Sequence, residues 1–388
     1  MLSTILCREL VSPRSNRFSW YNCRFRRNYG VSAHHERFKI LFLGRDEFSC
    51  DIFQELYASK DVWQSICVAT IPDTRLAHFH AAPLNSLAQS MNVPVEFIPP
   101  EKPDFKHWKP PPPFSSPGPP PENHMLITAS FGRILTPAQL ELFRPACRLN
   151  VHGSVLPAYR GPAPIQHAII DNAPQTGVCV AQMLKRGIDK GPVWASATIV
   201  CSLFPRDATF TSLRDALAVE GGRLLVGVLR EMLAGSASSA KSTPQPPESP
   251  TRHAHSITVD DAIVDFDTMT ADEIVARHRA VGHQRALTTW MPCGTRLHLY
   301  DPAVATPTHI RLWDPARLPK TPGGLRYHKP ARTLLLRCAQ GTFLAVPRVK
   351  KEKRSTLEAR EFWNGVLPHP RLVVDGELRL GEGECSVE

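Results

Sequence analysis

The stretch LNVHGSVLPAYRGPAPIQHAII, at residues 149–170, contains the most informative polar pattern of the chain. Asn150 and His152 are two residues apart, so in an extended strand both side chains point to the same face. The glycines and prolines that follow predict an irregular loop, and the run at residues 165–170 predicts a helix behind it. A later turn, Gly-Ile-Asp-Lys-Gly, supplies Asp189. Because an amide, an imidazole and a carboxylate can polarise a carbonyl and transfer protons, these residues predict chemistry at a carbonyl carbon.

Four short segments in this region resemble the signature of the folate-dependent formyltransferases. They read Asn-Val-His at 150–152, Ser-Val-Leu-Pro at 154–157, Arg-Gly-Pro-Ala-Pro at 160–164 and Gly-Ile-Asp-Lys-Gly at 187–191. Each segment alone is a weak signal, whereas their joint order and spacing is a strong one. The alternative for Asn150 and His152 is a satisfied polar pair at a strand end. The presence of Asp189 in its own glycine-flanked turn favours a catalytic site over a structural polar pair.

The resemblance implies a role for each polar residue in formyl transfer. Asn150 and His152 would donate hydrogen bonds to the oxyanion that develops on the formyl group. Asp189 would orient the imidazole and relay a proton from the attacking amine to N10 of the folate. No acyl-enzyme is implied. A serine hydrolase is disfavoured because Ser154 does not stand in a Gly-x-Ser-x-Gly nucleophile elbow.

The resemblance also implies that 10-formyltetrahydrofolate is the formyl donor and that no metal takes part. Two segments are expected to line the folate pocket, one after each of two predicted strands. The first comprises Ser154, Val155, Leu156 and Pro157, and the second comprises Ser130, Phe131 and Gly132. The alternative for the first segment is a rigid turn that only holds the site together.

Strands and helices alternate through residues 38–233, which predicts an α/β domain with a doubly wound, mostly parallel sheet. The first strand ends at Gly44, and no Gly-x-Gly-x-x-Gly follows, so a nicotinamide cofactor is not expected. Residues 177–184 and 193–201 predict a hairpin around the Asp189 turn, and residues 210–233 predict a long amphipathic helix. The proline-rich residues 99–121 cannot pair in a sheet and are expected to form a surface insertion, with a ligand for a proline-recognising domain as the alternative.

Residues 234–256 are rich in Ser and Pro and predict a linker, and short strands within residues 257–370 predict a small β-barrel. A helix predicted at residues 271–281, before Trp290, is followed by a late basic strand at 347–354 and by Phe-Trp-Asn-Gly at 362–365. With these features the second domain resembles the C-terminal domain of the methionyl-tRNA formyltransferases, a branch of the same family in which it is an oligonucleotide-binding-type barrel. Residues 371–388 are interpreted as a tail. The resemblance implies initiator methionyl-tRNA as the partner. The residues expected to bind RNA are Arg75, Arg160, Arg348, Lys350, Lys351, Lys353 and Arg354.

One loop departs from the bacterial pattern of that branch. Relatives acting on bacterial initiator tRNA carry several cations after the second strand, whereas residues 72–84 of this chain contain only Arg75 with two histidines. We therefore expect this loop to bind the tRNA more weakly than the bacterial loop does, or to bind it through Arg75 alone. The chemistry of formyl transfer is not affected by this departure.

The amino-acid composition indicates the cellular compartment and the charge of the binding partner. A net charge of +10 and a pI of 9.2 suggest a polyanionic partner. The first 37 residues contain seven arginines and two acids, which is typical of a mitochondrial transit peptide and predicts a matrix protein. The alternative is a disordered basic tail. The ten cysteines show no paired spacing, so we expect neither disulfides nor zinc. No apolar run is long enough for a membrane span, and a monomer is expected.

Two other functions compete with transfer of a formyl group to methionyl-tRNA. One is a formyltransferase acting on a small molecule, or a formyltetrahydrofolate hydrolase, since these enzymes share the Asn-His-Asp set. The other is a non-catalytic RNA-binding module. The basic second domain favours an RNA substrate over the first, and the intact polar set disfavours the second.

Overall fold

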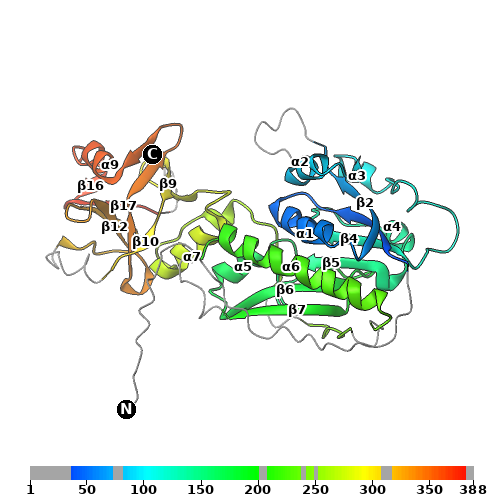
Figure 1. The fold of residues 1–388 in the computed structure, drawn as a ribbon. Coiled ribbons are helices and arrows are strands. Elements are labelled where there is room, and N and C mark those ends of the chain that lie inside the picture. Colours follow the sequence, from blue (N-terminus) through cyan, green and yellow to red (C-terminus); the bar gives the residue numbers. More distant parts are fainter. Residues whose placement is uncertain are drawn as a thin grey trace, which may run out of the picture.

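A computed structural model describes residues 36–72, 82–200, 208–236, 242–248, 252–306 and 317–381. The described residues form a helix-flanked sheet and a smaller β-rich part, joined beside helices α5 and α7 (Figure 1). Almost all of the predicted transit peptide, and Arg75 with most of its loop, lie outside these ranges. Within them, no helix combines the length and apolar character needed to cross a membrane.

The first part is built on a seven-stranded sheet of order β3-β2-β1-β4-β5-β6-β7. Its strands are β1 (Phe38–Leu43), β2 (Trp63–Thr70), β3 (Val95–Phe97), β4 (His124–Ala129), β5 (Arg148–His152), β6 (Gln175–Gln182) and β7 (Val193–Val200). The strands β1 to β5 are parallel to one another, and β6 runs antiparallel to both of its neighbours, β5 and β7. The doubly wound, mostly parallel sheet and the hairpin around the Asp189 turn are therefore confirmed.

Side chains that alternate along β1 point into two hydrophobic cores, one on each face of the sheet. Ile40 and Phe42 belong to the larger core and Leu41 and Leu43 to the smaller one. Helices α1 (Glu47–Ala58), α2 (Pro83–Ser90), α5 (Pro164–Ile170) and α6 (Phe210–Leu233) pack on the larger core. Helices α3 (Lys102–Phe105) and α4 (Pro137–Glu141) pack on the smaller one, and the 3₁₀ turn η1 (Pro145–Cys147) precedes β5. Burial on both faces explains why β1 and β4 are almost continuously apolar.

The proline-rich residues 99–121 contain no strand, as expected, but they do not lie only on the surface. Phe105, Trp108 and Phe114 are buried in the smaller core. The amide of Gln139 donates to the carbonyls of Phe105 and Trp108 at 2.8 and 2.9 Å. The prolines therefore shape a segment that three aromatic side chains anchor to the sheet.

The second part contains two antiparallel sheets that meet at their corners. The six-stranded sheet comprises β10 (Ala303–Val304), β13 (Phe343–Val346), β12 (Thr333–Arg337), β11 (Gly324–His328), β17 (Glu377–Arg379) and β16 (Val373–Val374). The four-stranded sheet comprises β15 (Thr356–Glu358), β14 (Arg348–Lys351), β9 (Arg296–Tyr300) and β8 (Leu287–Trp290). Pro347 separates β13 from β14, and a bridge joins Trp290 to Gly381, so the sheets meet at two corners as in a small barrel.

Helices and long-range pairing complete this second part. Its helical elements are η4 (Asp260–Ala262), α7 (Ala271–Val281), η6 (Ala339–Gly341) and α9 (Ala359–Val366). The prediction of a tail after residue 370 is wrong for residues 371–381, because Leu378 is fully buried and pairs with Leu325. Gly323 has φ +76°, and a Cβ there would lie 2.0 Å from the Leu380 carbonyl oxygen, so only glycine permits this pairing.

Candidate active site

Asn150 lies on β5, one strand away from the centre of the sheet. Its side-chain Oδ1 accepts a hydrogen bond of 2.7 Å from the Thr128 hydroxyl on the neighbouring strand β4. This contact fixes the rotation of the amide and leaves Nδ2 as the donor on its other side. The strand therefore presents the Nδ2 donor of Asn150 near its carboxyl end.

His152 ends β5, and its ring is held from both sides. Nε2 lies 3.0 Å from the carbonyl oxygen of Tyr159 and Nδ1 lies 3.9 Å from Oδ1 of Asp189. Because a carbonyl can only accept, Nε2 carries the hydrogen and Nδ1 faces the carboxylate. A neutral ring therefore offers an acceptor at Nδ1, and a protonated ring offers a donor there.

Asp189 lies in the turn between β6 and β7, where its backbone adopts a left-handed conformation with φ +53°. Its Oδ2 accepts a hydrogen bond of 3.0 Å from the backbone N–H of Gly161, while Oδ1 points to His152. The side chains of His152 and Asp189 are only 7 and 11% exposed, so their interaction is shielded from bulk water. The structure thus brings together the imidazole and carboxylate that the sequence suggested.

The segment after His152 divides into inward and outward residues. Ser154 is 1% exposed and its hydroxyl donates to the Ala158 carbonyl at 2.6 Å, which closes the loop on itself. Leu156 packs against Cys179 and Ala181 of β6. Val155 and Pro157 remain partly exposed. Of these four expected folate-pocket residues, two therefore stabilise the loop and two can face a ligand.

The segment after β4 divides in the same way. Phe131 is buried, and its ring lies edge-on to Phe105 at a centroid distance of 5.6 Å, so it belongs to the core. Ser130 and Gly132 are exposed. The Ser130 hydroxyl donates to the carboxylate of Asp46, which also caps helix α1 by accepting from Ser49 N–H.

Asp46 is a polar residue at this edge that the sequence analysis missed. It lies after β1, and Ser130 lies after β4, so the pair stands where the strand order of the sheet reverses. Burial raises the pKa of the Asp46 carboxyl, and the Ser130 hydroxyl partly offsets this. Its N-cap position two residues after Gly44 was the signal available in the sequence.

Arg160 does not have the role that was expected from the sequence. Its side chain is buried, and its guanidinium donates to the carbonyls of Pro246 and Pro247 at 2.7 and 3.0 Å. It also donates twice to Oε1 of Gln245. The prediction that Arg160 binds RNA is therefore wrong, because its donors are directed into the protein.

The basic strand β14 presents its cations on different faces. Lys350 pairs across the ladder with His298, and Arg348 lies on the same face and contacts Asp301. The Lys351 ammonium lies 5.4 Å from the centroid of the Phe362 ring, on the opposite face against α9. Lys353 and Arg354 are exposed in the turn that follows. Lys351 is thus less suited to an external partner than its neighbours.

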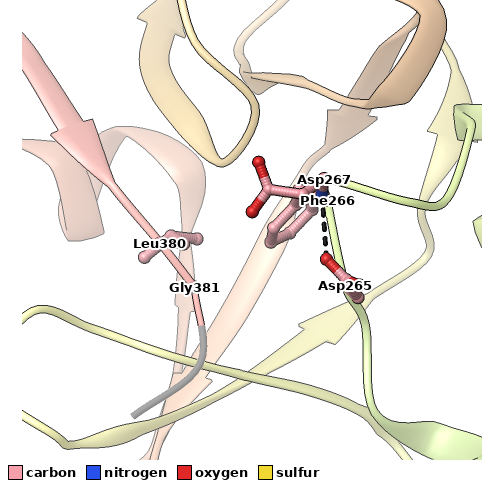
Figure 2. A pocket seen from close by; sticks show the side chains of 5 residues that line it. All are labelled: Asp265, Phe266, Asp267, Leu380 and Gly381. Atoms are coloured by element: carbon pink, nitrogen blue, oxygen red, sulfur yellow. Dashed lines mark hydrogen bonds between the residues drawn. The ribbon is translucent and has the colours of Figure 1, made fainter. Parts of the chain in front are cut away.

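A small pocket of about 210 Å³ lies in the second part of the chain, whereas Asn150, His152 and Asp189 belong to the first part (Figure 2). It is lined by Asp265, Phe266, Asp267, Leu380 and Gly381. Asp265 accepts hydrogen bonds from the Asp267 N–H and the Thr268 hydroxyl, so its carboxylate organises a local turn. Among the described residues, no group of three or more His, Cys, Asp or Glu side chains is placed to hold a metal ion.

Comparison with known proteins agrees with this geometry. Residues 120–229 match the formyl transferase family, and residues 256–367 match the formyl transferase C-terminal domain. The structure of WlaRD, described as a sugar 3N-formyl transferase, aligns with a TM-score of 0.53 at 13% identity over 83% of this chain and all of that one. The matches to both formyl transferase domains therefore place the chain among the formyltransferases.

Curated relatives narrow this class. Mitochondrial methionyl-tRNA formyltransferase of Mus musculus is 30% identical over 337 residues, which cover 85% of this chain and 78% of the relative. The Homo sapiens protein of the same name is 28% identical over 91% of this chain and 83% of its own length. The chain belongs to the methionyl-tRNA formyltransferase family.

Proposed function

We propose that this protein transfers the formyl group of 10-formyltetrahydrofolate to the amino group of initiator methionyl-tRNA. The single observation that carries the proposal is the arrangement of His152 and Asp189 beside Asn150 at the carboxyl end of β5. The family relationship supports methionyl-tRNA as the acceptor, since the relatives are named methionyl-tRNA formyltransferases.

The reaction needs a hydrogen-bond donor to the developing oxyanion and a path for the proton that leaves the amine. The amine nitrogen attacks the formyl carbon, and Asn150 Nδ2 stabilises the negative oxygen of the tetrahedral intermediate. Asp189 accepts the proton that the amine loses, and His152 stabilises the charge from Nδ1 when it is protonated. The proton passes to N10, the bond between the formyl carbon and N10 breaks, and formyl-methionyl-tRNA and tetrahydrofolate leave.

The folate donor is assigned to the edge formed by the ends of β4 and β5. The partly exposed Val155 and Pro157 supply apolar surface for a flat heterocycle, and Ser130 and Gly132 supply polar groups. Ser154, Leu156 and Phe131 support this edge from inside. Binding therefore depends on two partly exposed residues of the first predicted segment and two exposed residues of the second.

The RNA is assigned to Arg75, to the outer face of the four-stranded sheet and to the turn after it. Lys350 and Arg348 alternate with the buried Val349, which places them on one face with His298 and Tyr300 of β9. Cations interleaved with aromatic rings suit a polyanion with exposed bases. Lys353 and Arg354 extend this charge, whereas the Lys351 ammonium lies against the Phe362 ring on the opposite face and is not assigned to the RNA.

Location in the mitochondrial matrix is proposed from the arginine-rich residues 1–37 and from the mitochondrial relatives. Deletion of residues 2–36 should leave activity in vitro intact and should leave the protein in the cytosol. A truncated protein that still enters mitochondria would refute the targeting role. We also propose that the enzyme acts as a monomer, which sedimentation at working concentrations would test.

The decisive experiment measures formyl transfer by the chain lacking residues 2–36. Charged initiator tRNA and 10-formyltetrahydrofolate should yield formyl-methionyl-tRNA, whereas uncharged tRNA should not be modified. Formate release without tRNA would instead identify a hydrolase, and formylation of a free amine would identify a small-molecule transferase. Binding of tRNA without any formyl release would identify an RNA-binding module.

A further inference from the structure

The segment between the two parts of the chain lies against the active site. Its described residues are 242–248 and 252–256, and we call them the strap. Thr243 exchanges two backbone hydrogen bonds with Val193, at 2.9 and 2.8 Å, directly after the Asp189 turn. The strap was expected to be a linker, yet these contacts join it to the first sheet.

Gln245 of the strap reaches the turn that carries the catalytic carboxylate. Its Nε2 donates to the backbone carbonyls of Asp189 and Gly191, at 3.1 and 2.6 Å. Its Oε1 accepts from Nε and Nη2 of Arg160, at 3.2 and 2.9 Å. Both hydrogens and both acceptor positions of the amide are therefore used.

The Asp189 turn needs an external support of this kind. Asp189 has a positive φ, and Gly191 cannot be replaced, since a Cβ there would lie 1.7 Å from the Gln182 carbonyl oxygen. A residue held in this backbone region persists when its surroundings fix it. The two carbonyls that Gln245 binds belong to Asp189 itself and to the glycine that ends the turn. Gln245 therefore fixes the direction in which the Asp189 side chain leaves the backbone.

The strap also holds the other partner of the carboxylate. Ala254 exchanges backbone hydrogen bonds with Arg160 and Ala163, at 2.8 and 3.2 Å. Between them lies Gly161, whose N–H donates to Asp189 Oδ2 and whose Cβ, if present, would lie 2.5 Å from the Ala254 oxygen. One end of the strap thus fixes the backbone of Asp189, and the other end fixes the donor to its side chain.

We infer that Gln245 is a positioning residue for formyl transfer. It anchors the Asp189 turn to the strap and so holds Asp189 against His152, and the buried Arg160 fixes the orientation of the Gln245 amide. The inference rests on the proposed function, because it assigns Asp189 the proton transfer. The hydrogen bonds of the Gln245 amide go to protein groups, namely the Asp189 and Gly191 carbonyls and the Arg160 guanidinium. Its contribution should therefore appear in the rate of the chemical step and not in substrate binding.

Gln245→Glu tests this role with little change in shape. The carboxylate still accepts from Arg160, which supports folding, but it places an oxygen against the carbonyls of Asp189 and Gly191. Displacement of the turn by about 1 Å should lower kcat roughly a hundredfold, while KM for tRNA and folate stays within about threefold. Gln54→Glu, the same substitution at an exposed position of α1, is the matched control and should leave kcat unchanged.

Combining Gln245→Glu with Asp189→Asn distinguishes an effect on the position of Asp189 from a general loss of stability. Single-turnover formylation with saturating enzyme is measured for the parent, both single variants and the double variant. When it is added to the Asp189→Asn variant, Gln245→Glu should cost less than about threefold, since residues acting as a unit are strongly non-additive. An equal loss in both backgrounds, or a single variant as active as the parent, would overturn the inference. A parent that formylates no tRNA would refute the proposed function instead.

Discussion

The loop at residues 153–163 and the strap both approach Asp189 without regular secondary structure, yet they are stabilised differently. The loop closes on itself, through the Ser154 hydroxyl on Ala158 and the Tyr159 carbonyl on His152. The strap relies on partners far away in sequence, such as Gln245 on Asp189 and Gly191. A motif therefore reveals the first segment, whereas only the fold reveals the second.

This difference shows how the reactive carboxylate is held. The loop contributes the Gly161 N–H to the Asp189 side chain, and the strap contributes the Gln245 amide to its backbone. Neither contact involves a charged partner, so position is fixed by dipoles that leave the Asp189 charge available. Such preorganised groups are the usual basis of electrostatic catalysis.

The largest effect is expected when the carboxylate itself is changed. Asp189→Asn keeps the shape but cannot take the proton from the amine, so kcat should fall at least about a thousandfold. Binding of folate and tRNA should change little, which single-turnover kinetics and direct binding would establish. Asp104→Asn, at an exposed position of α3, is the control. Activity of Asp189→Asn within tenfold of the parent would remove Asp189 from the chemistry.

Arg160 is the residue at which the loop and the strap meet. Arg160→Ala leaves Gln245 Oε1 and two strap carbonyls without their donor and should lower the free energy of unfolding by about 3 kcal/mol. Arg160→Lys keeps the charge but lacks the planar fork and should recover only part of this. Denaturant titration measures both, with exposed Arg371→Ala as the control. Unchanged stability together with a reduced salt dependence of tRNA binding would restore Arg160 to the RNA interface.

The sequence predicted local features of the fold with good accuracy. Helices α6 and α7 have the expected limits, because each is amphipathic and begins at a threonine cap. Asn150 and His152 were found because the two-residue period of a strand is a local property. Trp108 and Leu378 were missed, since the core that buries the first and the strand that pairs the second lie elsewhere in the chain.

The site was predictable where its residues follow one another and not where it is assembled by the fold. Arg160 stands in a motif, which suggested a ligand, and burial by the strap gives it a structural role. Gln245 stands among Ser and Pro, a composition that usually indicates a flexible linker. Its role depends on the distance to Asp189 in space, and no spacing in the sequence encodes that distance.

The basic strand offers a comparison within a single element. Lys350→Ala removes a cation from the outer face and should raise KM for charged tRNA, with the salt slope reduced by roughly 0.7–0.9 if one phosphate contact is lost. Lys351→Ala should leave that slope unchanged, since its ammonium lies against Phe362. Kinetics at several salt concentrations would compare the two. Equal slopes for both variants and the parent would place the RNA elsewhere on the protein.

The smallest effect is expected from a histidine beneath the strap. His167 is fully buried, with Nε2 lying 3.0 Å from the His255 carbonyl, and burial lowers its pKa below the ordinary value of 6.5. Well above pH 6.5 the ring is neutral in both the folded and the unfolded chain and makes no pH-dependent contribution to stability. As the pH falls through that value, the unfolded chain binds the proton first, so stability declines until the folded pKa is passed.

His167→Gln should therefore lose less stability between about pH 7.5 and 5.5 than the parent does, whereas exposed His107→Gln should behave as the parent. Denaturant titrations at the two pH values would measure the difference, and an identical decline in parent and His167→Gln would show that protonation of this histidine does not destabilise the contact with the strap.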